Sequence, residues 1–132
     1  MMIFFDTDTL SYFSTGNSVI GDKMQKAIND GNQICLTIIN VYEILKGLKY
    51  KSNKNKEQWF KNFLPNITIF YLDDRAIDKA ADIYSDLRKR GLTIGDADIF
   101  IASIVIANGG KFITNNIRHY QNIDGLIMEN WC

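Results

Sequence analysis

The chain has 132 residues, a length that suits a single domain over residues 1–132, and its 46% hydrophobic and 23% charged residues are typical of a globular protein. Its 15 basic and 15 acidic side chains give a net charge of zero, which excludes a uniformly basic nucleic-acid binder but not a local basic patch. No signal peptide and no apolar stretch of about 18 residues is visible, so we expect a cytoplasmic protein that does not enter a membrane.

Short apolar runs predict buried strands, and segments of helical period predict helices. In chain order these are a strand at Met2–Phe5, a helix at Asn17–Asp30, a strand at Gln33–Leu36, a helix from the cap Thr37 to about Lys49, a helix at Lys54–Leu64, a strand at Ile67–Leu72, a helix between the cap Asp73 or Asp74 and Gly91, a helix at Asp96–Asn108, and strands at Phe112–Thr114 and Ile123–Met128. This alternation predicts an α/β fold with a parallel sheet, whose working site lies beyond the carboxyl ends of the strands.

Acidic and amide side chains stand where several of these elements meet that edge. Asp6 follows the first strand, Glu43 lies in an apolar helix face, and Asn116 follows a late strand. Asp96 and Asp98 open the helix that is apolar all round. Each has an ordinary structural explanation, since Asp is a common helix cap or first-turn acid and Glu43 can reach water from a boundary position.

Together these residues predict a metal site. Carboxylates that lie close together repel one another, and a divalent cation removes that repulsion. Oxygen ligands without His or Cys select Mg²⁺ or Mn²⁺, and such an ion suits phosphodiester hydrolysis. The lone His119 lies in a predicted turn, where we expect a structural or substrate-facing role.

A run of lysines supports a polyanionic substrate. Six lysines and one acid, Glu57, lie between Lys46 and Lys61, and Arg88–Arg90 adds a second basic run. Lysines beside an acidic pocket attract phosphates, although a solvated helix face explains the same pattern.

Four motifs, in order, resemble those of PIN-domain nucleases, and most closely the VapC-type toxins of prokaryotic toxin–antitoxin pairs. They are Phe4-Phe5-Asp6-Thr7-Asp8-Thr9-Leu10, Glu43-Ile44-Leu45-Lys46-Gly47, Ile94-Gly95-Asp96-Ala97-Asp98-Ile99-Phe100-Ile101-Ala102 and Thr114-Asn115-Asn116-Ile117-Arg118-His119-Tyr120. The resemblance implies a three-layer α/β/α sandwich and a Mg²⁺- or Mn²⁺-dependent endoribonuclease. It also implies inhibition by a cognate antitoxin, a homodimer, and structured RNA such as tRNA or ribosomal RNA loops as substrate.

The resemblance also implies roles by position. Asp6 and Asp98 match metal ligands, Glu43 matches the helical acid that binds metal or activates water, and Asp96 is a secondary ligand. Thr7 and Thr114 match hydroxyls that orient ligands or substrate. Asn116 occupies a position that is Asp in some members, so a complete second metal site is not implied. Lys46 and Lys49 are the expected RNA contacts.

Two alternatives remain open. Asp6-Thr7-Asp8 also resembles the opening motif of haloacid-dehalogenase-type phosphatases, in which Asp6 would be the nucleophile, but that interpretation gives Glu43 no role. The second alternative is a catalytically inactive binding module with the PIN fold. Its main support is Asn116, which stands where some members have Asp.

Overall fold

The computed structural model describes residues 1–132 and places five parallel strands at the centre of the molecule, in the spatial order β3–β2–β1–β4–β5. The strands are β1 (Met2–Phe5), β2 (Gln33–Thr37), β3 (Thr68–Phe70), β4 (Lys111–Ile113) and β5 (Ile127–Glu129). The chain extends the sheet from β1 through β2 to β3 and then crosses back to β4 on the other side of β1. The predicted parallel α/β architecture is confirmed, and the order of the strands reverses between β1 and β4.

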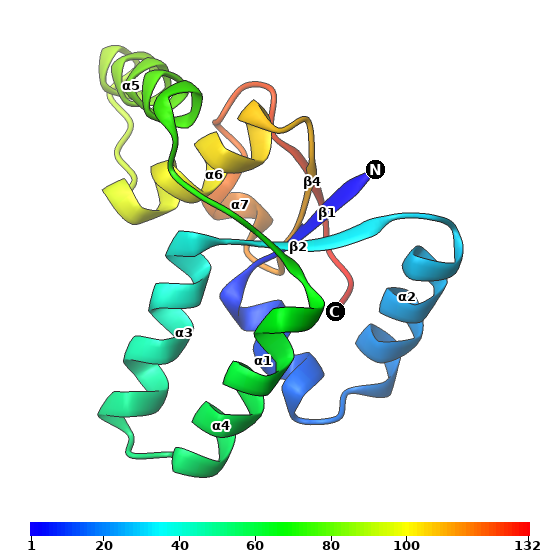
Figure 1. The fold of residues 1–132 in the computed structure, drawn as a ribbon. Coiled ribbons are helices and arrows are strands. Elements are labelled where there is room, and N and C mark those ends of the chain that lie inside the picture. Colours follow the sequence, from blue (N-terminus) through cyan, green and yellow to red (C-terminus); the bar gives the residue numbers. More distant parts are fainter.

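Helices cover both faces of this sheet (Figure 1). They are α1 (Thr7–Ser14), α2 (Ser18–Asn29), α3 (Ile38–Tyr50), α4 (Lys54–Phe63), α5 (Asp74–Lys89), α6 (Asp96–Ala107) and α7 (Ile117–Tyr120), with a 3₁₀ turn at Leu64–Asn66. None of these helices has the length and apolar character needed to cross a membrane.

Alternating side chains of the strands build two cores. Phe4 and Phe112 pack with residues of α5, α6 and α7, whereas Phe5 and Ile113 pack with residues of α1, α2, α3 and α4. Because successive strand residues point to opposite faces, one short apolar run serves both layers. The three-layer sandwich follows from this double burial.

Most helix limits agree with the sequence pattern. The side chains of Thr37 and Asp73 accept hydrogen bonds from the backbone N–H groups of the third residue on, and thus cap α3 and α5 as predicted. Gly91 follows the last turn of α5 and has a φ of 73°, a left-handed conformation that favours glycine and ends the helix there. The residue pattern sets no bounds for α1 and α7, since both are too short for a clear helical period.

Candidate active site

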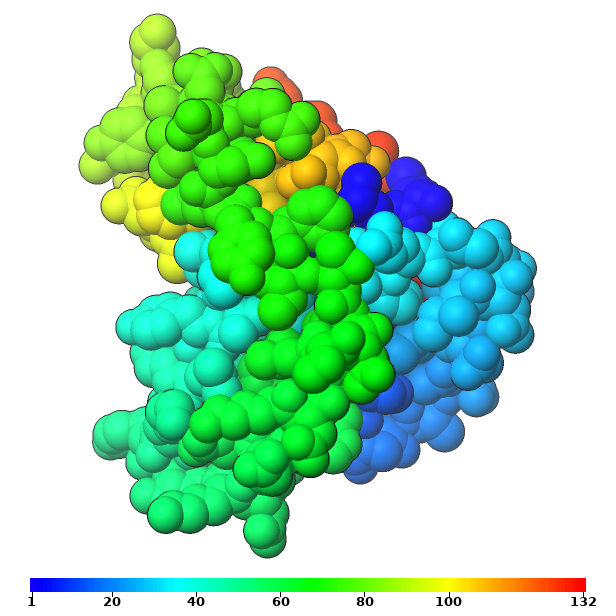
Figure 2. All heavy atoms as spheres, viewed as in Figure 1, coloured from blue at the N-terminus to red at the C-terminus, as the bar shows by residue number.

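An open cleft of about 350 Å³ lies at the carboxyl edge of the sheet, next to the point between β1 and β4 where the strand order reverses. Open parallel sheets usually bind ligands at such a point. Figure 2 shows the surface hollowed between the start of α6, in yellow, and α3, in cyan. The residues that line the cleft are Asp6, Thr7, Asp8, Glu43, Lys46, Asp98, Asn116, His119 and Tyr120.

Asp6 is the most deeply placed acid of this cleft, with only 8% of its surface exposed. It follows β1 directly and caps α1, because its Oδ1 accepts a hydrogen bond from the backbone N–H of Thr7 at 2.8 Å. Its Oδ2 accepts a hydrogen bond from the hydroxyl of Thr114 at 2.7 Å, just beyond the end of β4. The carboxylate is therefore fixed from both strands that flank the reversal point.

A buried amide connects Asp6 to the acid on α3. The Nδ2 of Asn40 donates to Thr7 Oγ1 at 3.0 Å and to Asp6 Oδ1 at 3.4 Å, and its Oδ1 accepts from the hydroxyl of Thr37 at 2.7 Å. The hydroxyl of Thr7 in turn donates to Glu43 Oε1 at 3.2 Å. Asp6, Thr7, Asn40 and Glu43 thus form one chain of hydrogen bonds, in which every buried polar side-chain atom has a partner.

Asp98 forms the opposite wall of the cleft, in the first turn of α6. Its Oδ1 accepts a hydrogen bond from the hydroxyl of Tyr120 at 3.1 Å, and its Oδ2 lies 2.7 Å from His119 Nε2. Both partners belong to α7. The side chains of Asp98 and His119 retain 29% and 36% exposure, so this wall stays open to water.

The carboxylates of Asp6, Glu43 and Asp98 repel one another in the cleft when no cation is bound. Burial raises the pKa of Asp6, and the charges of Asp8 and Asp98 raise it further against the lowering effect of its hydrogen bonds with Thr114 and Thr7. Burial likewise raises the pKa of Glu43, with added repulsion from Asp98 and Asp6 and a lowering effect from Lys46. The field of this cleft therefore disfavours further negative charge and favours a cation.

The family model described as PIN domain matches residues 3–126 of this chain. The chain belongs to the PIN-domain family. The matched range contains every residue that lines the cleft, so the family resemblance read from the four motifs is confirmed.

Known relatives of this PIN domain are VapC ribonucleases. Ribonuclease VapC2 of Rickettsia felis is 31% identical over 101 residues, which cover 76% of this chain and 75% of the relative. The tRNA(fMet)-specific endonuclease VapC of Salmonella typhimurium is 24% identical over 76% of this chain and 77% of its own length. The crystal structure of Rickettsia felis VapBC2, bound to a DNA fragment from its promoter, superimposes with a TM-score of 0.92 and 25% identity over 100% of both chains. These matches leave the alternative of a haloacid-dehalogenase-type phosphatase without support.

The donor set of this PIN domain fits a hard divalent cation in chemistry. Asp6, Glu43 and Asp98 offer carboxylate oxygens, and Asn116 offers an amide oxygen at the rim. In the structure no three acidic, His or Cys side chains lie close enough together to hold a metal ion as they stand. A common ion therefore requires side-chain rotation, for which the half-exposed Asp98 and Glu43 have room.

The structure does not bring all predicted site residues to the cleft. Asp96 lines a separate hollow beside Arg88 and Tyr84, so it does not join the other acids. Lys46 does line the cleft, and its ammonium lies 5.0 Å from the ring centre of Tyr42. Lys49 instead forms an ion pair with Glu57 at 2.9 Å and lies outside the cleft.

The supporting hydroxyls are placed as expected, and three further residues, the lining acid Asp8 among them, were missed. Thr7 and Thr114 both bind acids of the cleft, and the backbone N–H of Asn116 donates to Thr114 Oγ1 at 3.0 Å. Asn40 and the hydroxyl of Tyr120 are absent from the predicted site. A signal for Asn40 exists, because Thr37, Asn40 and Glu43 recur every three residues and so share one side of α3.

Proposed function

We propose that this PIN domain is the toxin of a toxin–antitoxin pair, and that it cleaves structured RNA with Mg²⁺ or Mn²⁺ held by Asp6, Glu43 and Asp98. The observation that carries the proposal is the convergence of these three acids from β1, α3 and α6 on one cleft, in a chain whose relatives are ribonucleases. The raised pKa values of Asp6 and Glu43 support it, since a bound cation relieves their repulsion.

Each side chain then has a distinct task. Asp6 and Asp98 would hold the ion, and the hydroxyls of Thr114 and Tyr120 keep their carboxylates in place. Glu43, held by Thr7, would bind the ion or accept the proton of the attacking water. Lys46 at the rim attracts the phosphate. When bound, the ion polarises the scissile phosphate and favours attack by water.

The test is cleavage of purified tRNA and ribosomal RNA fragments with Mg²⁺, with Mn²⁺ and with EDTA. The wild type, Asp6→Asn and Glu43→Gln are compared under identical conditions. We expect cleavage with either ion, none with EDTA, and a loss of about 100-fold or more in both variants.

Three outcomes distinguish the alternatives. Cleavage in EDTA, or cleavage that survives both substitutions, contradicts the metal-nuclease mechanism. RNA or metal binding without turnover in the wild type favours the inactive module instead. Cutting confined to one RNA class identifies the substrate, for which the endonuclease of Salmonella typhimurium makes initiator tRNA the first to test.

The proposed partners are a cognate antitoxin and a second copy of the chain, in the cytoplasm. The solved neighbour from Rickettsia felis is a VapBC complex, which supports an antitoxin. Tyr12 and Val19 remain 44% and 53% exposed and are available for protein contacts, whereas Ile20 is fully buried in the core. Co-expression with a candidate antitoxin tests the first partner, and light scattering at several concentrations tests the second.

A further inference from the structure

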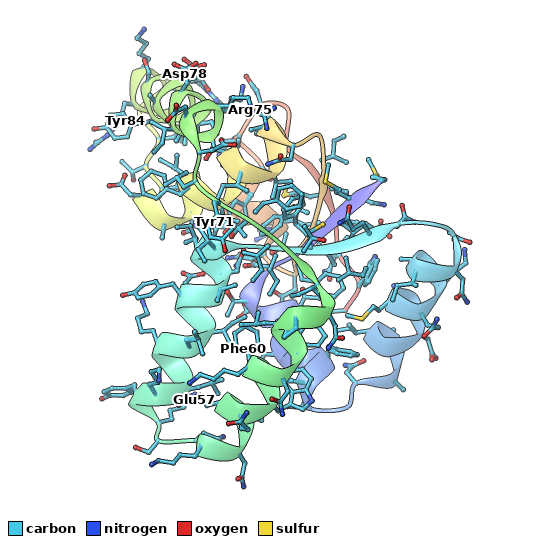
Figure 3. The ribbon with its side chains drawn as sticks, viewed as in Figure 1. Glu57, Phe60, Tyr71, Arg75, Asp78 and Tyr84 are labelled. Carbon is cyan, nitrogen blue, oxygen red and sulfur yellow. The ribbon has the colours of Figure 1, made fainter.

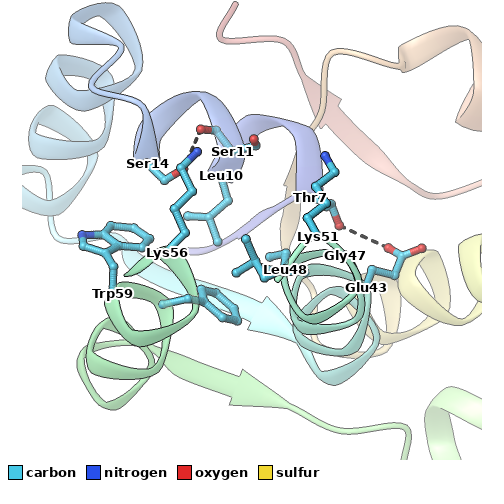
Figure 4. A pocket seen from close by; sticks show the side chains of 12 residues that line it. Thr7, Leu10, Ser11, Ser14, Glu43, Gly47, Leu48, Lys51, Lys56 and Trp59 are labelled. Atoms are coloured by element: carbon cyan, nitrogen blue, oxygen red, sulfur yellow. Dashed lines mark hydrogen bonds between the residues drawn. The ribbon is translucent and has the colours of Figure 1, made fainter. Parts of the chain in front are cut away.

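A groove leads away from the cleft and shares Thr7 and Glu43 with it. Its space is about 180 Å³, and its walls come from α1, α3 and α4 (Figure 4). Leu10, Leu48 and Phe60 form its apolar floor. Because the groove and the cleft meet at the same two residues, a long molecule bound in one passes directly into the other.

Four of the six lysines between Lys46 and Lys61 fall into two sets. Lys51 and Lys56 line the groove, and neither forms an ion pair. Glu57 lies on α4 (labelled in Figure 3) and forms ion pairs with Lys49 and Lys61, at 2.9 and 2.8 Å. The two ammonium groups lower the pKa of Glu57 to about 2, so this acid stays charged and largely neutralises them. Lys51 and Lys56 therefore give the groove positive charge that no acid neutralises, as Lys46 does at the cleft.

An aromatic ring lies at the far end of the groove. Trp59 is 38% exposed and stacks on Phe63 with a ring separation of 5.2 Å and an angle of 9°. Phe63 thus holds the indole in place while part of it remains accessible. Nucleic-acid bases stack on rings presented in this way, and lysines beside them bind the backbone.

We infer that this groove binds the RNA strand on one side of the scissile phosphate, with phosphates against Lys51 and Lys56 and a base against Trp59. The inference rests on the proposed ribonuclease function, because an endonuclease substrate must continue beyond the point of cleavage. The opposite wall of the cleft carries Asp98, whose charge repels a phosphate backbone, so the strand leaves toward the lysines.

The experiment compares two double variants that remove the same charge from the two sets. Lys51→Ala/Lys56→Ala removes the two ammonium groups that line the groove. Lys49→Ala/Lys61→Ala removes the two that pair with Glu57. Both are combined with Asp6→Asn, and binding of a fluorescent single-stranded RNA is measured without cleavage at several salt concentrations. We expect the groove pair to weaken binding about tenfold or more and to reduce the salt slope by about 1.4, and the other pair to change affinity less than about twofold.

A second measurement reads the stacking directly. Replacing Trp131, which packs inside against Phe5, by Phe leaves Trp59 as the only indole. We expect RNA to quench its fluorescence, and Trp59→Phe to weaken RNA binding several-fold with the fold intact by circular dichroism.

Three results overturn the inference: equal loss of affinity in both double variants, no loss in either, or an unchanged Trp59 signal at saturating RNA. If the groove pair weakens only binding of a protein antitoxin, the groove belongs to that protein and not to RNA. These outcomes are separate from failure of the proposed function, in which the wild type does not cleave RNA with any metal.

Discussion

The two walls of the cleft hold their acids in different ways. Asp6 is buried between β1 and β4 and bound by Thr114, the backbone of Thr7 and, at longer range, Asn40. Asp98 stands half-exposed at the start of α6, bound by two neighbours on the short α7. Burial fixes the geometry of the Asp6 carboxylate and destabilises its ionised form. Water near Asp98 solvates its charge and allows its side chain to move. The comparison indicates one rigid and one adjustable side for the proposed ion.

The rigid wall gives the largest expected effect. Asp6→Asn keeps a side chain that caps α1 but removes the buried charge. We expect metal-dependent cleavage to fall about 1000-fold, while the metal-free protein gains about 1 kcal/mol because repulsion in the cleft is relieved. Cleavage assays and urea unfolding in EDTA measure the two effects.

Asp8→Asn is the matched control for this variant. It removes the same charge from the same cleft at an exposed position, so we expect less than about a tenfold loss of cleavage. Equal losses in the two variants contradict the special role of the buried acid.

Asn40→Ala tests whether the rigid wall depends on its hydrogen-bond network. The substitution leaves Thr7 and Asp6 without their amide donor, and we expect Mn²⁺ affinity and cleavage to fall about 10- to 100-fold. Calorimetric titration of Mn²⁺ into protein that is folded by circular dichroism measures the affinity.

Asn17→Ala provides the comparison for stability alone. Asn17 caps α2 through the backbone N–H of Ile20 and does not line the cleft, and its loss costs about 1 kcal/mol. Mn²⁺ affinity should not change in this variant. If both Asn variants lose the same affinity, the network around Asn40 only stabilises the fold.

His119→Ala addresses the adjustable wall. Water can replace the imidazole at the half-exposed Asp98, so we expect less than about a fivefold loss of cleavage and a stability change within about 0.5 kcal/mol. Tyr120→Phe, which keeps the ring packed on Phe112 at 5.2 Å, is the companion variant. A loss in either variant as large as that of Asn40→Ala would show that the two walls do not differ.

The dependence of stability on pH gives the smallest effect. Since the raised pKa of Asp6 means that the folded state binds this proton more tightly, stability falls as the pH rises above the ordinary value of 3.8 through the raised value. In EDTA the stability advantage of Asp6→Asn over the wild type should therefore grow from about pH 4 to pH 7. If the free energies of unfolding of the two proteins change with pH in the same way, the raised pKa of Asp6 is contradicted.

The sequence predicted the layout of the site better than its details. The strand-edge rule brought Asp6, Glu43 and Asp98 together correctly, because short apolar runs mark parallel strands well. It did not separate Asp98 from Asp96. Asp96 and Asp98 are two positions apart, so their side chains point about 200° apart around the helix axis. Because α6 is apolar on all sides, no polar face indicates which of the two acids points to the cleft.

Long-range geometry explains the other misses. Lys49 and Glu57 lie on different helices, and their ion pair depends on how α3 packs against α4, which local sequence does not determine. The link from Asn40 to Asp6 spans 34 positions and also depends on tertiary packing. Only the spacing of Thr37, Asn40 and Glu43 on one helix was available in advance.

Asp6 both caps α1 and is the most buried acid of the cleft, and these two roles together affect which escape mutants a genetic selection yields. Alanine at this position removes a helix cap, at a cost of about 1 kcal/mol, together with the acid. Among cells that survive expression of this chain, escape mutants at position 6 should therefore fall into two groups. Asn leaves an abundant, folded and silent protein, whereas apolar residues leave a scarce one that proteases remove.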